Sequence, residues 1–219
     1  SDKGLTVDGS DRKDGDQYEN EDKPETRSFT WREAIKERSF WLLSTGHSLS
    51  LLAVSSMLAH LIPHLTNSLS YSLRDASIAF SLMTGLQLIG IFLGGYLGDK
   101  YNKKKLVVFC MLGHFLGLMA IAFASDSYWV VAFAILHGIA WGIRGPLMVA
   151  LRADYFGSKF FGTIMGFSSL IVMIGMTFGP IICGILYDYY GNYQLAFTLM
   201  ASASLLGAVC FWLCESPQG

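Results

Sequence analysis

The stretch Gly95-Tyr96-Leu97-Gly98-Asp99-Lys100-Tyr101-Asn102-Lys103-Lys104-Lys105 separates two long runs that contain no charged side chain. The run before it, residues 76–98, has 23 residues, and the run after it, residues 106–125, has 20. A transmembrane helix needs about 20 mainly apolar residues, and basic residues collect in cytoplasmic loops. The stretch therefore predicts a tight cytoplasmic turn between two membrane-spanning helices.

The charges of the whole chain are segregated in the same way. Of the 219 residues 52% are hydrophobic, and the net charge is only -1. Residues 1–38 carry 11 acidic and 8 basic side chains, whereas residues 39–219 carry only 6 and 8. A soluble core of this size would not leave such long uncharged runs. We therefore predict an all-α membrane protein, with a polar cytoplasmic linker at 1–38 and a six-helix transmembrane domain at 39–219.

The predicted linker changes character along its length. Residues 1–27 are nearly free of apolar side chains, so we expect them to be disordered. Within residues 29–38, Thr30 and Glu33 have the spacing of a capping box, and Trp31 and Ile35 belong to an apolar stripe beside basic residues. This pattern predicts a short amphipathic helix on the inner membrane surface. An ordinary helix that only leads into the membrane fits the pattern as well.

Six apolar segments follow the linker, and they predict six transmembrane helices. Their glycines recur every four residues, which allows helix backbones to approach closely in lipid. Prolines fall near the outer end of the first segment and within the fourth and fifth. The predicted spans are residues 39–66, 75–98, 106–124, 128–151, 161–187 and 193–214.

The basic residues predict the orientation of these spans. Ten Lys and Arg residues from residue 27 onward lie on the side of the linker, and Arg74 lies on the other. Because the positive side is cytoplasmic, both termini are expected inside. The chain starts without Met in a polar segment, so we also expect an upstream part to be missing.

The opening stretch resembles the signature loop of the major facilitator superfamily, G-x-x-x-D-[RK]-x-G-[RK]-[RK]. The matching residues are Gly95, Asp99, Lys100, Lys103 and Lys104, and Asn102 stands where the family usually has Gly. The resemblance implies that this loop is part of a cytoplasmic gate. It also implies that Asp99 contacts the start of the fifth span near Gly162.

Residues 29–214 resemble the C-terminal six-helix half of a twelve-helix transporter, closest to the monocarboxylate and oxalate–formate branch. The matching segments lie at residues 29–43, 142–166 and 179–191. The second span lacks the Arg usual in that branch, and its most polar residue is Gln87. The resemblance implies a secondary active transporter that moves a small organic anion, such as a monocarboxylate, by alternating access. Because residues 142–166 are similar to bacterial members near that branch, it also implies a prokaryotic inner (plasma) membrane. The transporter's partners would be the bilayer and an N-terminal six-helix half or a second copy.

The fourth span contains the only charged side chain predicted away from a turn, Arg144. His137, Trp141 and Arg144 share one helix face, and with Gln87 and His60 they are our candidates for a substrate cavity. In the alternative, Arg144 extends toward the cytoplasm and braces the gate. His137 fits either an interhelical hydrogen bond or a proton-binding site.

The remaining polar residues exclude several functions. His60 and His64, four residues apart, suit a haem or metal ligand pair, but no carboxylate or Cys joins them, so we favour cavity-lining residues. We expect His47 and His114 to be packing or surface residues, and no span has an internal Asp or Glu. No phosphate loop, nucleophile motif or nucleic-acid face is recognisable, so we predict no enzyme and no cofactor. A non-transporting membrane receptor and a haem-based redox protein remain the alternatives.

Overall fold

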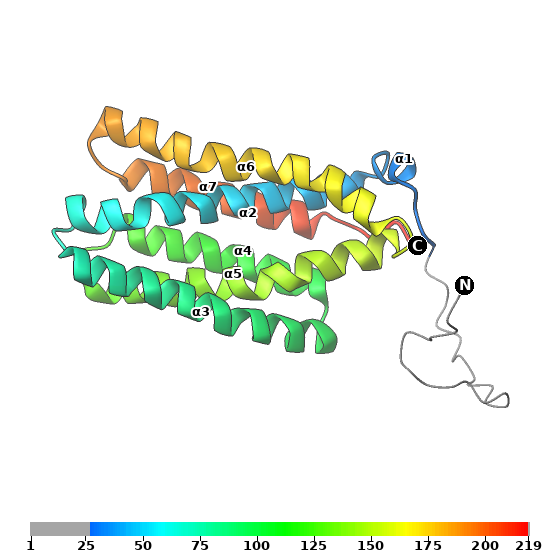
Figure 1. Cartoon of the computed structure of the whole chain (residues 1–219), viewed down its shortest axis with the longest axis horizontal. Coiled ribbons are helices and arrows are strands. Elements are labelled where there is room, and N and C mark those ends of the chain that lie inside the picture. The colour runs from blue at the N-terminus through cyan, green and yellow to red at the C-terminus, as the bar shows by residue number, and fades with distance from the viewer. Residues whose placement is uncertain (1–26, 219) are drawn as a thin grey trace, which may run out of the picture.

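The structure, a computed structural model, describes residues 27–218. Within these residues six helices are long and apolar enough to cross a membrane, which confirms the predicted six-helix fold (Figure 1). A four-residue helix precedes them, and one turn of π-helix continues the first of them. The elements are α1 (Trp31–Ala34), α2 (Arg38–Pro63), η1 (His64–Ser68), α3 (Leu73–Lys100), α4 (Lys103–Ala122), α5 (Ser127–Phe156), α6 (Phe161–Tyr190) and α7 (Gln194–Trp212).

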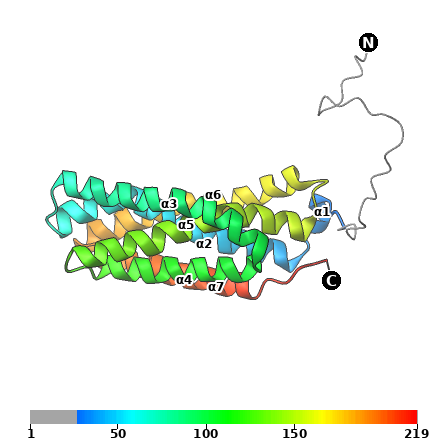
Figure 2. The same ribbon diagram turned by 90° about the horizontal axis from the view of Figure 1, so that it is seen from below.

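The six long helices run side by side along one axis, as Figures 1 and 2 show. They pack in the order α3, α5, α4, α7, α2, α6, so α3 and α6 are the two ends of the row. Only 17% and 22% of the residues in the most apolar windows of α3 and α6 are buried, against 44–50% in the other four helices. The bundle therefore leaves α3 and α6 as its most exposed helices.

Glycines bring two pairs of helices into backbone contact, as their spacing predicted. A Cβ atom on Gly90 of α3 would lie 2.6 Å from the Ile139 carbonyl oxygen of α5 and 2.9 Å from the Gly142 Cα. On α6, a Cβ atom on Gly175 would collide with the Ser48 backbone of α2. Because no side chain fits between these backbones, α3 packs tightly on α5 and α6 packs tightly on α2.

One predicted boundary is wrong in a way that affects the site. The fourth span was expected to end at Leu151, with Arg152 in a turn, but α5 continues to Phe156. The helix stops at Gly157, whose φ of 78° lies in a region that glycine adopts without strain. Arg152 is therefore helical, and only 2% of it is exposed.

The linker forms a shorter helix than predicted. The Thr30–Glu33 capping box is present, but α1 spans only four residues instead of most of 29–38. The hydrogen bond from the Thr30 backbone N–H lowers the pKa of the Glu33 carboxyl. Trp31 stacks on Phe167 of α6 at 5.1 Å, and the Phe29 backbone N–H donates to the Phe156 carbonyl at 2.9 Å. This segment therefore packs against the end of the bundle, while the disorder predicted for residues 1–27 falls, except for residue 27, outside the described residues.

Candidate functional site

Two arginines of α5 are buried inside the bundle. Arg144 is 1% exposed and Arg152 is 2% exposed. The two ion pairs found within residues 27–218 join other residues, Arg27 to Glu33 and Lys103 to Asp154. Both guanidinium groups are thus buried without a carboxylate partner among the described residues, an arrangement that is costly unless other groups compensate the charge.

The buried charge of Arg152 is stabilised by neutral hydrogen-bond acceptors from three helices. It donates to the Ser168 Oγ of α6, to the Met148 carbonyl of α5 and to the His47 Nδ1 of α2, each at 3.0 Å. Ser168 also shares a 2.8 Å hydrogen bond with Ser44 of α2. The side chain therefore joins α2, α5 and α6 at one point. Sequence analysis missed this network because it placed Arg152 in a turn, although Gly157 marks where the helix stops.

Arg144 has no comparable set of partners. Its Nε and Nη1 atoms are buried, and neither makes a hydrogen bond within the described chain. The side chain lies within electrostatic range of Cys110 on α4 and His47 on α2. Arg144 is 1% exposed in this structure, and its role in a substrate cavity or in the cytoplasmic gate stays a prediction.

His137 lies in the same interior region as Arg144. The Nδ1 atoms of His137 and His114 are 3.1 Å apart, so one ring donates a hydrogen bond to the other across α4 and α5. Both rings are fully buried, and the Nε2 atom of each lacks a partner. His137 also stacks on Phe133 at 5.2 Å. The interhelical hydrogen bond suggested for His137 is therefore present. Trp141 is partly buried and packs against the hydrophobic core.

His60 and His64 are engaged by different helices. The His60 Nε2 atom donates to the Pro180 carbonyl at 2.9 Å, and its Nδ1 atom accepts from the Tyr193 hydroxyl at 3.2 Å. The His64 Nε2 atom donates to the Ile121 carbonyl at 3.2 Å. Both His60 nitrogens are thus occupied, and the described residues contain no group of three His, Cys, Asp or Glu that could hold a metal.

The predicted gate residues lie in the last turns of α3 and the first turn of α4, on either side of the short connection between the two helices. Lys103 binds Asp154 of α5 at 2.7 Å, and Lys100 lies over the ring of Tyr96 and hydrogen-bonds to its hydroxyl. Asp99 is exposed, and its side chain makes no hydrogen bond or ion pair within residues 27–218. Its contact with the start of α6 stays a prediction, and the observed link from this turn runs to α5.

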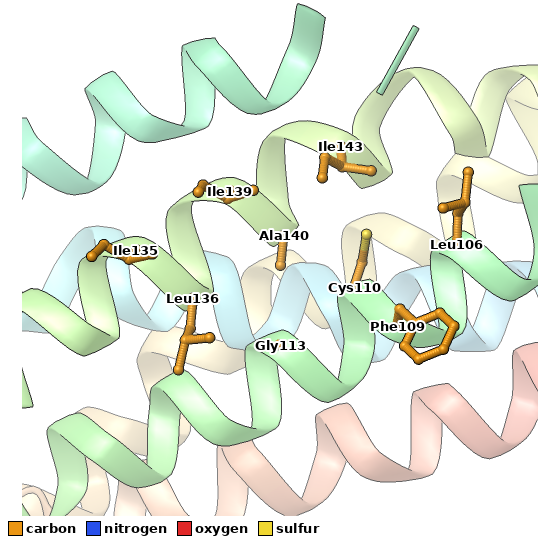
Figure 3. Close-up of a pocket in the computed structure, with 9 residues that line it drawn as sticks. All are labelled: Leu106, Phe109, Cys110, Gly113, Ile135, Leu136, Ile139, Ala140 and Ile143. Carbon is orange, nitrogen blue, oxygen red and sulfur yellow. The ribbon is translucent and has the colours of Figure 1, made fainter. Parts of the chain in front are cut away.

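The remaining candidates lie apart from this interior cluster. Gln87 is partly exposed on α3, and its backbone carbonyl packs against Gly142 of α5. Gly95 is exposed, and Lys104 is partly exposed at the start of α4. The apolar groove between α4 and α5 contains none of the predicted substrate residues (Figure 3). The structure therefore gathers Arg144, His137 and His114 in one buried region and leaves Gln87 and the gate residues elsewhere.

The bundle and its six membrane-length helices define an integral membrane protein. Residues 43–219 match the sequence profile of the Major Facilitator Superfamily, and the chain belongs to this family. The resemblance noted from the turn at 95–105 is thereby confirmed.

Known proteins similar to this chain are considerably longer. The uncharacterized MFS-type transporter YqjV of Bacillus subtilis is 23% identical over 167 residues, which cover 76% of this chain and 40% of that protein. Monocarboxylate transporter 10 of Mus musculus is 27% identical over 190 residues, covering 84% and 36%. The crystal structure of the peptide transporter POT in complex with sulfate has a TM-score of 0.72 at 20% identity, covering 80% of this chain and 37% of that one. The chain thus spans about two-fifths of the length of these proteins.

Proposed function

We propose that this chain is the C-terminal half of a secondary active transporter that moves a small organic anion across the membrane by alternating access. Family membership and the six-helix bundle support the transporter class. In such folds two similar halves rock against each other around a central site. An N-terminal half or a second copy would pack on α3 and α6, the helices that the bundle leaves most exposed.

The proposal that the substrate is an anion rests on the buried guanidinium group of Arg144. It is 1% exposed, and its Nε and Nη1 atoms are without partners in the described chain. A planar guanidinium with free donors matches a carboxylate, which accepts two parallel hydrogen bonds. The match to a protein named monocarboxylate transporter 10 points to the same substrate chemistry.

A substrate carboxylate would compensate the charge of Arg144 when the rocking of the two halves opens a path to it. Trp141, three residues before Arg144 and partly exposed, would provide an aromatic wall on the route. Arg152 would hold the cytoplasmic ends of α2, α5 and α6 together during this motion through its three hydrogen bonds. The protein would need no chemical step and no cofactor for this activity.

The placement in the membrane follows from the distribution of basic residues. The end of α3 and the start of α4 carry Lys100, Lys103, Lys104 and Lys105, whereas Arg74 lies at the opposite end of α3. The positive-inside rule then places both termini in the cytoplasm. We propose that this membrane is the inner (plasma) membrane of a prokaryote; a Bacillus subtilis protein is among the similar sequences.

The test is counterflow of a labelled anion in proteoliposomes that contain the full-length protein. Vesicles loaded with unlabelled lactate should accumulate external labelled lactate or another monocarboxylate, and Arg144→Met should reduce this at least a hundredfold. Leu116→Ala, a change on the exposed face of α4 away from Arg144, should leave counterflow unchanged. Full activity of Arg144→Met would reject the anion site. Saturable binding without flux would instead favour a non-transporting receptor.

A further inference from the structure

His47 of α2 lies close to both buried arginines of α5. Its Nδ1 atom is 3.0 Å from the Nη2 atom of Arg152, and its ring is within electrostatic range of Arg144 as well. In the packing order of the helices, α4 and α7 lie between α5 and α2. The His47 ring therefore connects α2 directly to the arginine-bearing helix.

The hydrogen bond with Arg152 determines which nitrogen of the His47 ring carries the proton. A guanidinium group stays protonated in proteins and has only N–H donors, so Arg152 donates and the His47 Nδ1 atom accepts. A proton on Nδ1 would set two donors against each other. The ring is therefore neutral, and its hydrogen is on Nε2.

The Nε2–H group of His47 is a donor without a partner in the part of the chain that the structure describes. The Nε2 atom makes no hydrogen bond within residues 27–218, and the side chain is partly exposed. The Nε2 atoms of His114 and His137 also lack partners, but those two atoms are buried, whereas the His47 atom is not. A ligand can therefore reach this donor.

The two arginines make this donor suitable for an anion. A hydrogen bond from a cation polarises the group that accepts it, so Arg152 strengthens the N–H donor on the other side of the ring. Hydrogen bonds to an ionised partner are roughly twice as strong as neutral ones. Arg144 supplies a full positive charge nearby, with its Nε and Nη1 atoms unpartnered. His47 adds a donor to this region without adding a third buried charge.

We propose that His47 is a second anion-binding residue of the site at Arg144, and that Arg152 is the positioning residue that keeps the His47 proton on Nε2. A carboxylate has two oxygen atoms with about four acceptor positions, so it can accept from Arg144 and His47 at the same time. Because these residues lie on different helices, the bound anion links α5 to α2. This inference rests on the proposed anion transport, since it extends the same site.

The experiment compares two substitutions of His47 in the full-length protein, because each retains one function of the ring. Asn places an oxygen where Nδ1 lies and can accept from Arg152, but it has no donor at the Nε2 position. In lactate counterflow, His47→Asn should raise KM about tenfold, the value of one hydrogen bond to a charged group. Its resistance to unfolding by sodium dodecyl sulfate should equal that of the wild-type protein.

His47→Gln should have the opposite effects. Gln places an N–H donor near the Nε2 position but offers Arg152 no acceptor, so KM should stay close to the wild-type value while the protein unfolds at a lower detergent fraction. Thr45→Ala is the matched control, because it removes an exposed side chain of the same helix. This control should leave both KM and the resistance to unfolding unchanged.

Nitrogen NMR of protein labelled at its histidine rings tests the tautomer without transport. The His47 signals are those missing from the spectrum of His47→Asn. They should show a protonated Nε2 and an unprotonated Nδ1, and added lactate should shift the Nε2 signal.

The possible outcomes separate this inference from the proposed function. Lactate counterflow with an unchanged KM in His47→Asn would overturn the role of His47 and leave the proposed function intact. A ring protonated at Nδ1 would do the same, and an equal rise of KM in both variants would indicate a structural role only. No counterflow of any monocarboxylate by the wild-type protein would reject the proposed function, and the role of His47 with it.

Discussion

Arg144→Met should make the protein more stable while it removes transport. Met has a similar length and no polar group, so it fills the space of the arginine stem. The wild-type side chain buries two nitrogen atoms, Nε and Nη1, that make no hydrogen bond in the described chain. Each such buried unsatisfied group costs about 1–3 kcal/mol. Replacement of buried charges by apolar residues of similar volume is often neutral or stabilising by about 1–4 kcal/mol.

We therefore expect the free energy of unfolding to rise by about 1–4 kcal/mol in Arg144→Met. Arg152→Met is the matched control, because the same substitution on the same helix breaks three hydrogen bonds. It leaves the His47 ring without its donor, and we expect a loss of about 2–4 kcal/mol. The two variants should thus change stability in opposite directions.

The assay is reversible unfolding of the full-length protein by sodium dodecyl sulfate in mixed micelles, combined with anion counterflow in proteoliposomes. In our proposal, the stability that Arg144 costs is offset by the anion binding that its unpaired guanidinium provides. If Arg144→Met were destabilised as strongly as Arg152→Met, Arg144 would have a structural partner. The argument for an anion site at this residue would then fail.

Three further predictions concern packing and the cytoplasmic end. Gly175→Leu should destabilise the protein by about 1–3 kcal/mol in the same unfolding assay, because the new side chain would force α6 away from the α2 backbone. Gly166→Leu, whose side chain would point into open space, should be neutral, and equal effects of the two substitutions would contradict the observed packing of α6 on α2. Asp154→Asn should change the free energy of unfolding by less than about 1 kcal/mol, because the Asp154 side chain is 50% exposed in its ion pair with Lys103. A loss above about 2 kcal/mol in that assay would show that the ion pair stabilises the protein more than its exposure suggests. Trp31→Ala removes the ring that stacks on α6 at 5.1 Å, so limited trypsin digestion should cut the linker several-fold faster, and an unchanged rate would mean that the linker is held by other contacts.

The helix packing shows how much a local pattern can predict. The glycines at four-residue intervals predicted close helix contacts, but they did not say which helices would meet. The structure pairs Gly90 of α3 with α5 and Gly175 of α6 with α2. A pattern along one helix describes a face of that helix, whereas the partner depends on how all six helices are arranged.

The candidate site shows a second limit of sequence reasoning. His137 and Arg144 were correctly placed on one helix face, because seven residues correspond to nearly two full turns. Whether that face points to a cavity or to the bundle interior depends on the neighbouring helices. The partner of His137 is His114, 23 residues away on α4, and Arg152 meets His47, 105 residues away on α2. Contacts between residues so far apart leave no periodic signal in the chain.

The sequence by itself determined the class of the protein, because repeated uncharged, mainly apolar runs of about 20 residues have the length that a bilayer-spanning helix needs and the turn at 95–105 carries the family motif. It also determined the capping box at Thr30, which needs only neighbouring residues. Only the tertiary structure decided that α5 continues through Arg152, that two arginines lie in the interior, and that one of them keeps unpaired donors. The physical reason is that burial and hydrogen-bond partners depend on which helices pack together, and that packing brings together residues from distant parts of the chain.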